Sequence, residues 1–107
     1  MPYFFCRLNP PRPSFALDMT DEERALMEEH GAYWAGHMEH GKVVVFGVVG
    51  DPAGPWGASI VEVADEGAAQ ALTVEDPVIV RGDGFSYDIF SMPNAVAPSA
   101  RRGSTDL

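Results

Sequence analysis

The stretch KVVVFGVV, residues 42–49, is β-branched and apolar after its first residue, without the polar alternation of a half-buried strand. A turn-rich segment with two glycines and two prolines follows at 50–55. Beyond it, residues 56–63 again combine aromatic and β-branched residues. Residues 42–63 therefore predict a β-hairpin with a broad loop.

The segment before this hairpin predicts the longest helix of the chain. Thr20-Asp21-Glu22-Glu23 fits a capping box, in which the Thr20 hydroxyl and the Glu23 carboxylate each accept a hydrogen bond from a free amide. Gly41 is a typical residue just beyond a helix end. Between them, helical spacing places one stripe of side chains on a shared face: Leu26, Met27, His30, Tyr33, Trp34, His37 and Met38.

The flanking segments complete the order of elements. Residues 2–8 are rich in aromatic residues and stop at Asn9-Pro10-Pro11, which predicts a first strand followed by a Pro-rich connection over 9–19. Asp65 is suited to cap a second, shorter helix that Pro77 closes off, and residues 85–90 predict a last strand. The order βαββαβ predicts a ferredoxin-like α+β fold, with both helices on one face of a four-stranded antiparallel sheet.

Both faces of this sheet are expected to be apolar. Alternation over 42–49 puts Val43, Val45 and Val49 on one side, and Val44, Phe46 and Val48 on the other. Phe4 and Phe5 likewise point in opposite directions. Because the helices cover one face, we expect the open face to bind a second copy in a homodimer. The alternative is that the Pro-rich loop or the C-terminal tail covers it.

Length and charge limit the classes of function. The chain of 107 residues fits one domain, which we place at 1–93, followed by a loose tail at 94–107. A net charge of −9 disfavours binding to nucleic acid or to an anionic membrane. A single cysteine, Cys6, leaves no intrachain disulfide, so a cytoplasmic protein is expected. The N-terminus has no pattern of a signal peptide, and the apolar runs are too short for a membrane span.

Three short motifs carry a resemblance to a known family. They are His30 in the middle of the helix, Gly41-Lys42 before the apolar strand, and Glu75-Asp76-Pro77 with Gly82 after it. Together they resemble the YCII-related family of dimeric α+β barrel proteins over roughly residues 1–93. The resemblance implies that His30 and Asp76 form the active-site pair. Val78 departs from the family, which often has an aromatic residue there, and the loop from Gly50 to Gly57 is specific to this chain.

The chemistry of such a pair follows from the two residue types. Asp76 precedes proline and is restricted to extended backbone, so its carboxylate projects from a stiff corner. A carboxylate bonded to one imidazole nitrogen fixes the tautomer and raises the basicity of the other nitrogen. His30 would then be a general base and Asp76 its orienting group. The alternative is structural: a helix histidine at the margin of the core, and a turn residue that caps local amides.

Five residues are candidates for contacts with a substrate. Tyr3, Phe5 and Trp56, together with Phe46, would line an apolar pocket suited to ring compounds, and Arg7 would meet an anionic group. Cys6 is either a nucleophile beside His30 or, more simply, a small apolar residue on an inward strand face.

The remaining histidines do not predict a metal site. His30, His37 and His40 lack the pair at i and i+4 with an intervening glutamate that is typical of a zinc helix. Near a helix C-terminus, His40 is suited to interact with the helix dipole. We expect neither a metal nor another cofactor.

Three functions remain open. The resemblance favours a small enzyme of lyase, isomerase or dehalogenation type, acting on compounds derived from aromatic rings through proton transfer at His30. A non-catalytic module that binds a small ligand in the same pocket is the first alternative. A haem-dependent monooxygenase of the dimeric barrel type is the second, and it would need a wide cavity for the porphyrin.

Overall fold

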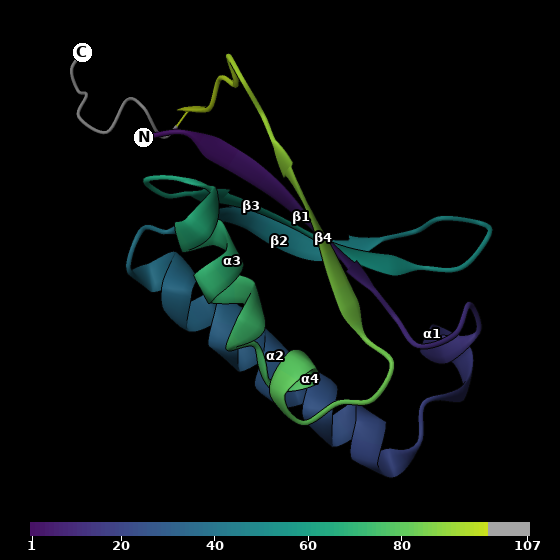
Figure 1. Cartoon of the computed structure of the whole chain (residues 1–107). Helices are drawn as coiled ribbons and strands as arrows, with labels where there is room; N and C mark the ends of the chain where they lie inside the picture. The colour runs from purple at the N-terminus through teal and green to yellow at the C-terminus, as the bar shows by residue number, and fades with distance from the viewer. Residues whose placement is uncertain (99–107) are drawn as a thin grey trace.

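A computed structural model of the chain describes residues 1–98 as four strands and four helices (Figure 1). The α+β fold predicted from the sequence is confirmed, with two short helices in addition. In chain order the elements are β1 (Tyr3–Asn9), α1 (Phe15–Asp18), α2 (Asp21–Glu39), β2 (Val43–Val49), β3 (Trp56–Glu62), α3 (Glu66–Val74), α4 (Pro77–Val80) and β4 (Ser86–Ser91).

The four strands form one sheet in the order β2-β3-β1-β4, and each neighbouring pair is antiparallel. Helices α2, α3 and α4 lie together on one side of this sheet, while α1 lies beyond the end of β1 (Figure 1). Residues 1–98 thus form two layers, as expected for this order of elements, and no helix among them covers the other face of the sheet.

The ends of α2 follow the local sequence. Thr20 Oγ1 accepts a hydrogen bond from the Glu23 amide at 3.1 Å, and the Glu23 carboxylate accepts one from the Thr20 amide at 2.9 Å. The predicted capping box is therefore confirmed. At the other end, His40 caps the helix and Gly41 adopts a φ of 79°, a left-handed conformation that glycine adopts without strain.

Strand alternation builds the core between sheet and helices. On β1 the buried residues are Phe4, Cys6 and Leu8, and the residues between them face the opposite side. Trp34 of α2 and Val61 of β3 pack against this inner face with 1% and 0% exposure. The helix layer and the sheet thus enclose one continuous apolar cluster that fixes the position of α2 over β1.

The structure corrects one prediction about the faces of β2 and one about the segment that follows α3. A register shift between Val43 and Val45 places Val43, whose partner is the buried Val61, on the same face as Phe46. The prediction that the Val43 and Val45 side chains share a face is therefore wrong. A bulge inserts one extra residue between them and interrupts the simple alternation. Pro77 also does more than end α3, since it begins α4 with Asp76 as the N-cap.

The open face carries an aromatic cluster that extends from β3 across β1 to the edge strand β4. Phe5 stacks on Phe90 with ring centroids 6.1 Å apart and meets the edge of Trp56 at 6.2 Å. Phe90 and Val45 remain about half exposed, at 52% and 51%. The prediction that both faces of the sheet are apolar is therefore confirmed.

Two further expectations concern segments outside the core. Within residues 1–98, no helix combines the length and the apolar character needed to cross a membrane. The tail predicted at 94–107 falls mostly on residues 99–107, which lie outside the described part of the chain.

Candidate functional site

The carboxylate of Asp76 is the centre of a buried hydrogen-bond network. Its Oδ2 atom accepts from the Tyr87 hydroxyl at 2.5 Å and from the Trp34 indole at 2.7 Å, and it lies 2.8 Å from Nδ1 of His30. Its Oδ1 atom accepts from the Val78 amide at 3.0 Å. Asp76 itself is 0% exposed, so four donors take the place of water around one carboxylate.

Three parts of the fold bring these groups together. His30 and Trp34 lie one turn apart on α2 and therefore share a face of the helix. Asp76 stands at the corner between α3 and α4 in extended backbone (φ −61°, ψ 132°), as the following proline requires. Tyr87 comes from the inner face of β4, where it pairs with the buried Leu8. The tertiary fold therefore assembles the network.

The network keeps Asp76 charged and Tyr87 neutral. Burial on its own would raise the pKa of Asp76, but the hydrogen bonds from His30, Tyr87 and Trp34, with the charge of His30, outweigh it and lower the pKa. Burial and the nearby Asp76 charge raise the pKa of Tyr87 far above its ordinary value. At neutral pH the site is thus an anion held by neutral donors and by one imidazole.

The contact with Asp76 fixes the tautomer of His30. A carboxylate is only an acceptor, so the proton of a neutral His30 ring lies on Nδ1 and points to Oδ2. The Nε2 atom, on the far side of the ring, carries a free lone pair. Because the His30 ring lines the cavity described next while Asp76 does not, Nε2 is the nitrogen available to a ligand.

Beside His30 lies a mostly apolar cavity of about 280 Å³ between the sheet and α2. Its walls come from the inner face of the sheet, from α2, and from the segments at 10–19 and near Phe85. The aromatic members are Phe15, Trp34, Phe46, Phe85 and Tyr87; the others include Cys6, Leu8, Met19, Met27, Val48 and Ser59. Trp56 also borders the cavity, although its ring packs against Phe5 and Arg7 on the open face of the sheet. Such a cavity suits a compact apolar ligand oriented by a few polar contacts.

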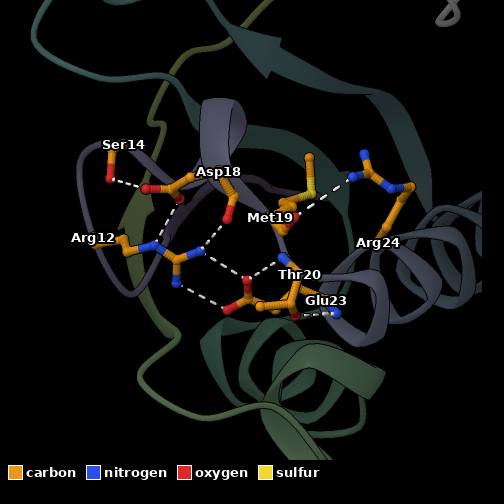
Figure 2. Close-up of polar contacts among 7 residues, drawn as sticks. All are labelled: Arg12, Ser14, Asp18, Met19, Thr20, Glu23 and Arg24. Atoms are coloured by element: carbon orange, nitrogen blue, oxygen red, sulfur yellow. Dashed lines mark hydrogen bonds and ion pairs between the residues drawn. The ribbon is translucent and has the colours of Figure 1, made fainter.

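An arginine holds the 10–19 segment against α2 (Figure 2). Arg12 donates to both carboxylate oxygens of Glu23, at 2.8 and 2.9 Å, and its Nε atom donates to Asp18 at 2.8 Å. The Arg12 hydrogen bond, followed by that of the Thr20 amide, lowers the pKa of Glu23 to about 2. This ion-pair cluster positions Phe15, which meets Phe85 edge to face at 5.2 Å and closes one wall of the cavity.

The structure brings together some of the predicted site residues and separates others. His30 and Asp76 are in direct contact, and Phe46 lines the cavity. Trp56 borders the cavity, but its ring packs against Phe5 and Arg7 on the open face. Tyr3, Phe5 and Arg7 point instead to the open face of the sheet, because they alternate with the buried residues of β1.

Arg7 is also engaged elsewhere. Its guanidinium lies 4.1 Å from the centre of the Trp56 ring, and its Nε atom donates to Asn9 at 3.0 Å. Two other arginines are paired as well: Arg12 with Asp18 and Glu23, and Arg81 with Glu29. Among the described residues, no lysine or arginine lines the cavity.

Cys6 lines the cavity with a protonated thiol. Burial raises its pKa to about 11, and the nearby Ser59 hydroxyl acts in the opposite direction without reversing the shift. This state favours the apolar role over that of a nucleophile, since the thiolate is the reactive form.

The other histidines lie apart from the cavity. His37 packs against Tyr33 at a ring distance of 4.6 Å, and burial, then the charges of Lys42 and His40, lower its pKa. His40 Nδ1 donates to the Gly36 carbonyl at 2.8 Å, at the helix end where the dipole interaction was expected. No group of three or more metal-binding side chains converges anywhere in residues 1–98.

The sequence reasoning missed three functional groups. Trp34 is predicted only as part of the side-chain stripe of the long helix, and no pattern singles out Tyr87 or Ser59. Alternation supplied a signal for Tyr87, because it lies two positions from Ile89 on the strand predicted at 85–90. For Trp34 the signal was its spacing of four residues from His30.

Comparison with known proteins agrees with this architecture. The model of the YCII-related domain matches residues 3–93 of the chain, which include all four strands and both members of the His30–Asp76 pair. No curated protein matches the chain.

Proposed function

Since the chain belongs to the YCII-related family, we propose that it is a small-molecule enzyme in which His30 is the general base and Asp76 orients it. The observation that carries the proposal is the 2.8 Å contact between Nδ1 of His30 and a fully buried, anionic Asp76. This contact leaves Nε2 free at the cavity and stabilises the imidazolium that forms when Nε2 takes a proton.

The reaction class follows from this single base. Nε2 would remove a proton from a carbon next to a carbonyl group, and the electron pair of that bond would move toward the carbonyl. An isomerase would return the proton to another atom, and a lyase or dehalogenating enzyme would expel a leaving group with the electron pair. These are the lyase, isomerase and dehalogenation types that the family resemblance favours.

The size and lining of the cavity support a small, ring-derived substrate. Its volume of about 280 Å³ lies near the lower limit of ligand pockets, roughly 300 to 1,000 Å³. Aromatic side chains contribute much of the wall, which suits a flat apolar ring. A porphyrin is larger than this volume accommodates, so the cavity does not favour the haem-dependent alternative.

A binding module without turnover is the second candidate, and one observation favours it. Of the ionisable side chains that line the cavity, Cys6 and Tyr87 have raised pKa values and stay protonated near neutral pH. Neither of them therefore supplies a second base, and the Tyr87 proton is already donated to Asp76. A reaction that needs two such groups would have to use His30 twice, whereas simple binding needs neither.

We also propose that two copies of the chain meet through the open face of the sheet. Phe5 of β1 stacks on Phe90 of the edge strand β4, and both Phe90 and Val45 are about half exposed in the single chain. Burial of this patch against an identical patch would satisfy the rule that a two-fold interface pairs a surface with itself.

The catalytic proposal is tested by turnover of a panel of ring-derived carbonyl compounds, followed by proton exchange, isomer formation or halide release. We expect His30→Gln to lower the rate by about 10² to 10⁴ and Asp76→Asn to lower it less. His40→Gln is the matched control, because His40 lies on the same helix away from the cavity. Full activity of a folded His30→Gln protein would refute the role of His30 as general base. Ligand binding without turnover in the native protein would favour the non-catalytic binding module.

A further inference from the structure

Ser59 has a buried hydroxyl that lacks a strong hydrogen-bond partner within residues 1–98. The residue is 4% exposed, lies on the inner face of β3 opposite Cys6, and lines the cavity. Within the described chain its Oγ atom forms no hydrogen bond of ordinary geometry, and the neighbouring Cys6 thiol, whose pKa it lowers, is only a weak partner. An unsatisfied buried hydroxyl destabilises the folded state, so its position in a cavity wall points to a partner that enters from the cavity.

The other polar side-chain atoms around the cavity are mostly engaged. The Trp34 indole and the Tyr87 hydroxyl both bond to Asp76, and the Trp56 indole donates to Asp51 at 3.0 Å. His30 Nε2 and Ser59 Oγ are the strong hydrogen-bonding side-chain atoms left for a ligand. The cavity therefore presents two polar points in an apolar wall.

The charges of the side chains around the cavity limit the charge of the ligand that it can bind. No Asp, Glu, Lys or Arg of residues 1–98 contributes to the wall, and the Asp76 anion lies directly behind His30. An anionic ligand would find no fixed cation to balance its charge and would lie close to a buried carboxylate. An uncharged ligand avoids this cost.

We propose that the cavity takes an uncharged, mainly apolar compound with two polar groups, and that Ser59 Oγ donates a hydrogen bond to an acceptor such as a carbonyl oxygen. The second polar group of the ligand lies at Nε2 of His30. This inference rests on the proposed function, because it names the class of compound on which His30 would act. Ser59 is then a specificity-determining residue that separates carbonyl compounds from their hydrocarbon analogues.

The test compares three probes in the native protein by NMR titration of the cavity resonances at about pH 6.5. 4-Hydroxyacetophenone is uncharged and has the carbonyl acceptor, 4-ethylphenol lacks the acceptor, and 4-hydroxybenzoate is anionic because carboxyl groups ionise well below this pH. We expect the ketone to bind most tightly and the benzoate most weakly. Absence of any response of the cavity resonances to the ketone would overturn the inference.

The decisive variant is Ser59→Ala. It should weaken binding of the ketone by about three- to tenfold, leave 4-ethylphenol unchanged, and keep or raise resistance to urea, since an unpaired hydroxyl is removed. A structural serine would show the reverse, with lower stability and equal affinities. Ser91→Ala, on exposed β4 outside the cavity, is the control, and Ser59→Cys, with a weaker donor, should give an intermediate loss.

The two proposals fail separately in these experiments. Equal ketone affinity in native protein and Ser59→Ala, with a water bonded to Ser59, would overturn the inference and leave the His30 proposal standing. Ser59-dependent ketone binding without turnover of any carbonyl compound would support the inference and refute catalysis.

Discussion

Nδ1 of His30 lies 2.8 Å from Oδ2 of Asp76, although the two residues are 46 positions apart in the chain. The carboxylate is fully buried, while the His30 side chain retains 16% exposure at the cavity. One partner is thus fixed inside the protein and the other is accessible to a ligand. This division of roles is what an orienting group and a base require.

Removal of the Asp76 carboxylate should destabilise the protein far more than removal of an ordinary helix cap. Asp76→Ala leaves the Trp34 and Tyr87 donors buried without their acceptor, so we expect a loss of about 3 to 5 kcal/mol in urea unfolding. Asp65→Ala is the matched control, because Asp65 caps α3 from an exposed position, and it should cost about 1 kcal/mol. Equal losses would show that Asp76 is only a cap.

The contribution of Asp76 should also depend on acid pH. Its pKa is lowered from an ordinary value of 3.8, so the folded state binds its proton more weakly than the unfolded state. The stabilisation is therefore complete above the ordinary pKa and disappears as pH falls through the folded pKa. We expect the difference in free energy of unfolding between native protein and Asp76→Asn to shrink as pH falls below 3.8. A difference independent of pH would contradict this.

Loosening of the Arg12 cluster should affect the cavity before it affects the whole fold. Arg12→Lys removes the two-pronged contact with Glu23 that holds the segment carrying Phe15. We expect faster amide hydrogen exchange over residues 15–18 and weaker binding of 4-ethylphenol, with little change in the urea midpoint. Arg24→Lys is the control, because Arg24 reaches only the Met19 carbonyl at 3.5 Å. Unchanged exchange in Arg12→Lys would show that packing alone holds the segment.

Formation of the proposed homodimer should depend on the aromatic cluster of the open face. Native protein is expected to have the mass of a dimer in light scattering at micromolar concentration, and Phe90→Glu that of a monomer, because burial of a charge is costly. Val80→Glu is the control, since Val80 is also exposed, at 62%, but lies on α4 in the helix layer. Monomeric native protein, or dimeric Phe90→Glu, would contradict the proposed interface.

Local signals in the sequence account for most of the fold. The capping box at Thr20, the glycine after the long helix and the β-branched run at 42–49 each act within a few residues, so they could be interpreted without tertiary contacts. The bulge in β2 could not be found in this way. It depends on the pairing of Val43 with Val61, which is a contact between strands.

The candidate site shows the same limit. The sequence predicts His30 and Asp76. Trp34 and Tyr87 join them only because the corner at Asp76 contacts both α2 and β4 in the folded chain. The alternation of side chains along the first strand did contain information about the site. Once Cys6 is placed toward the helices, alternation sends Phe5 and Arg7 to the open face, away from the cavity.

The most direct measurement of the central claim is the tautomer of His30, from long-range proton–nitrogen NMR spectra of the imidazole rings at neutral pH. In native protein we expect the proton on Nδ1 and an unprotonated Nε2, and in Asp76→Asn a clear change of the His30 signals, while His37 and His40 stay as they were. A proton on Nε2 of native His30, or His30 signals that ignore the loss of the carboxylate, would contradict the account.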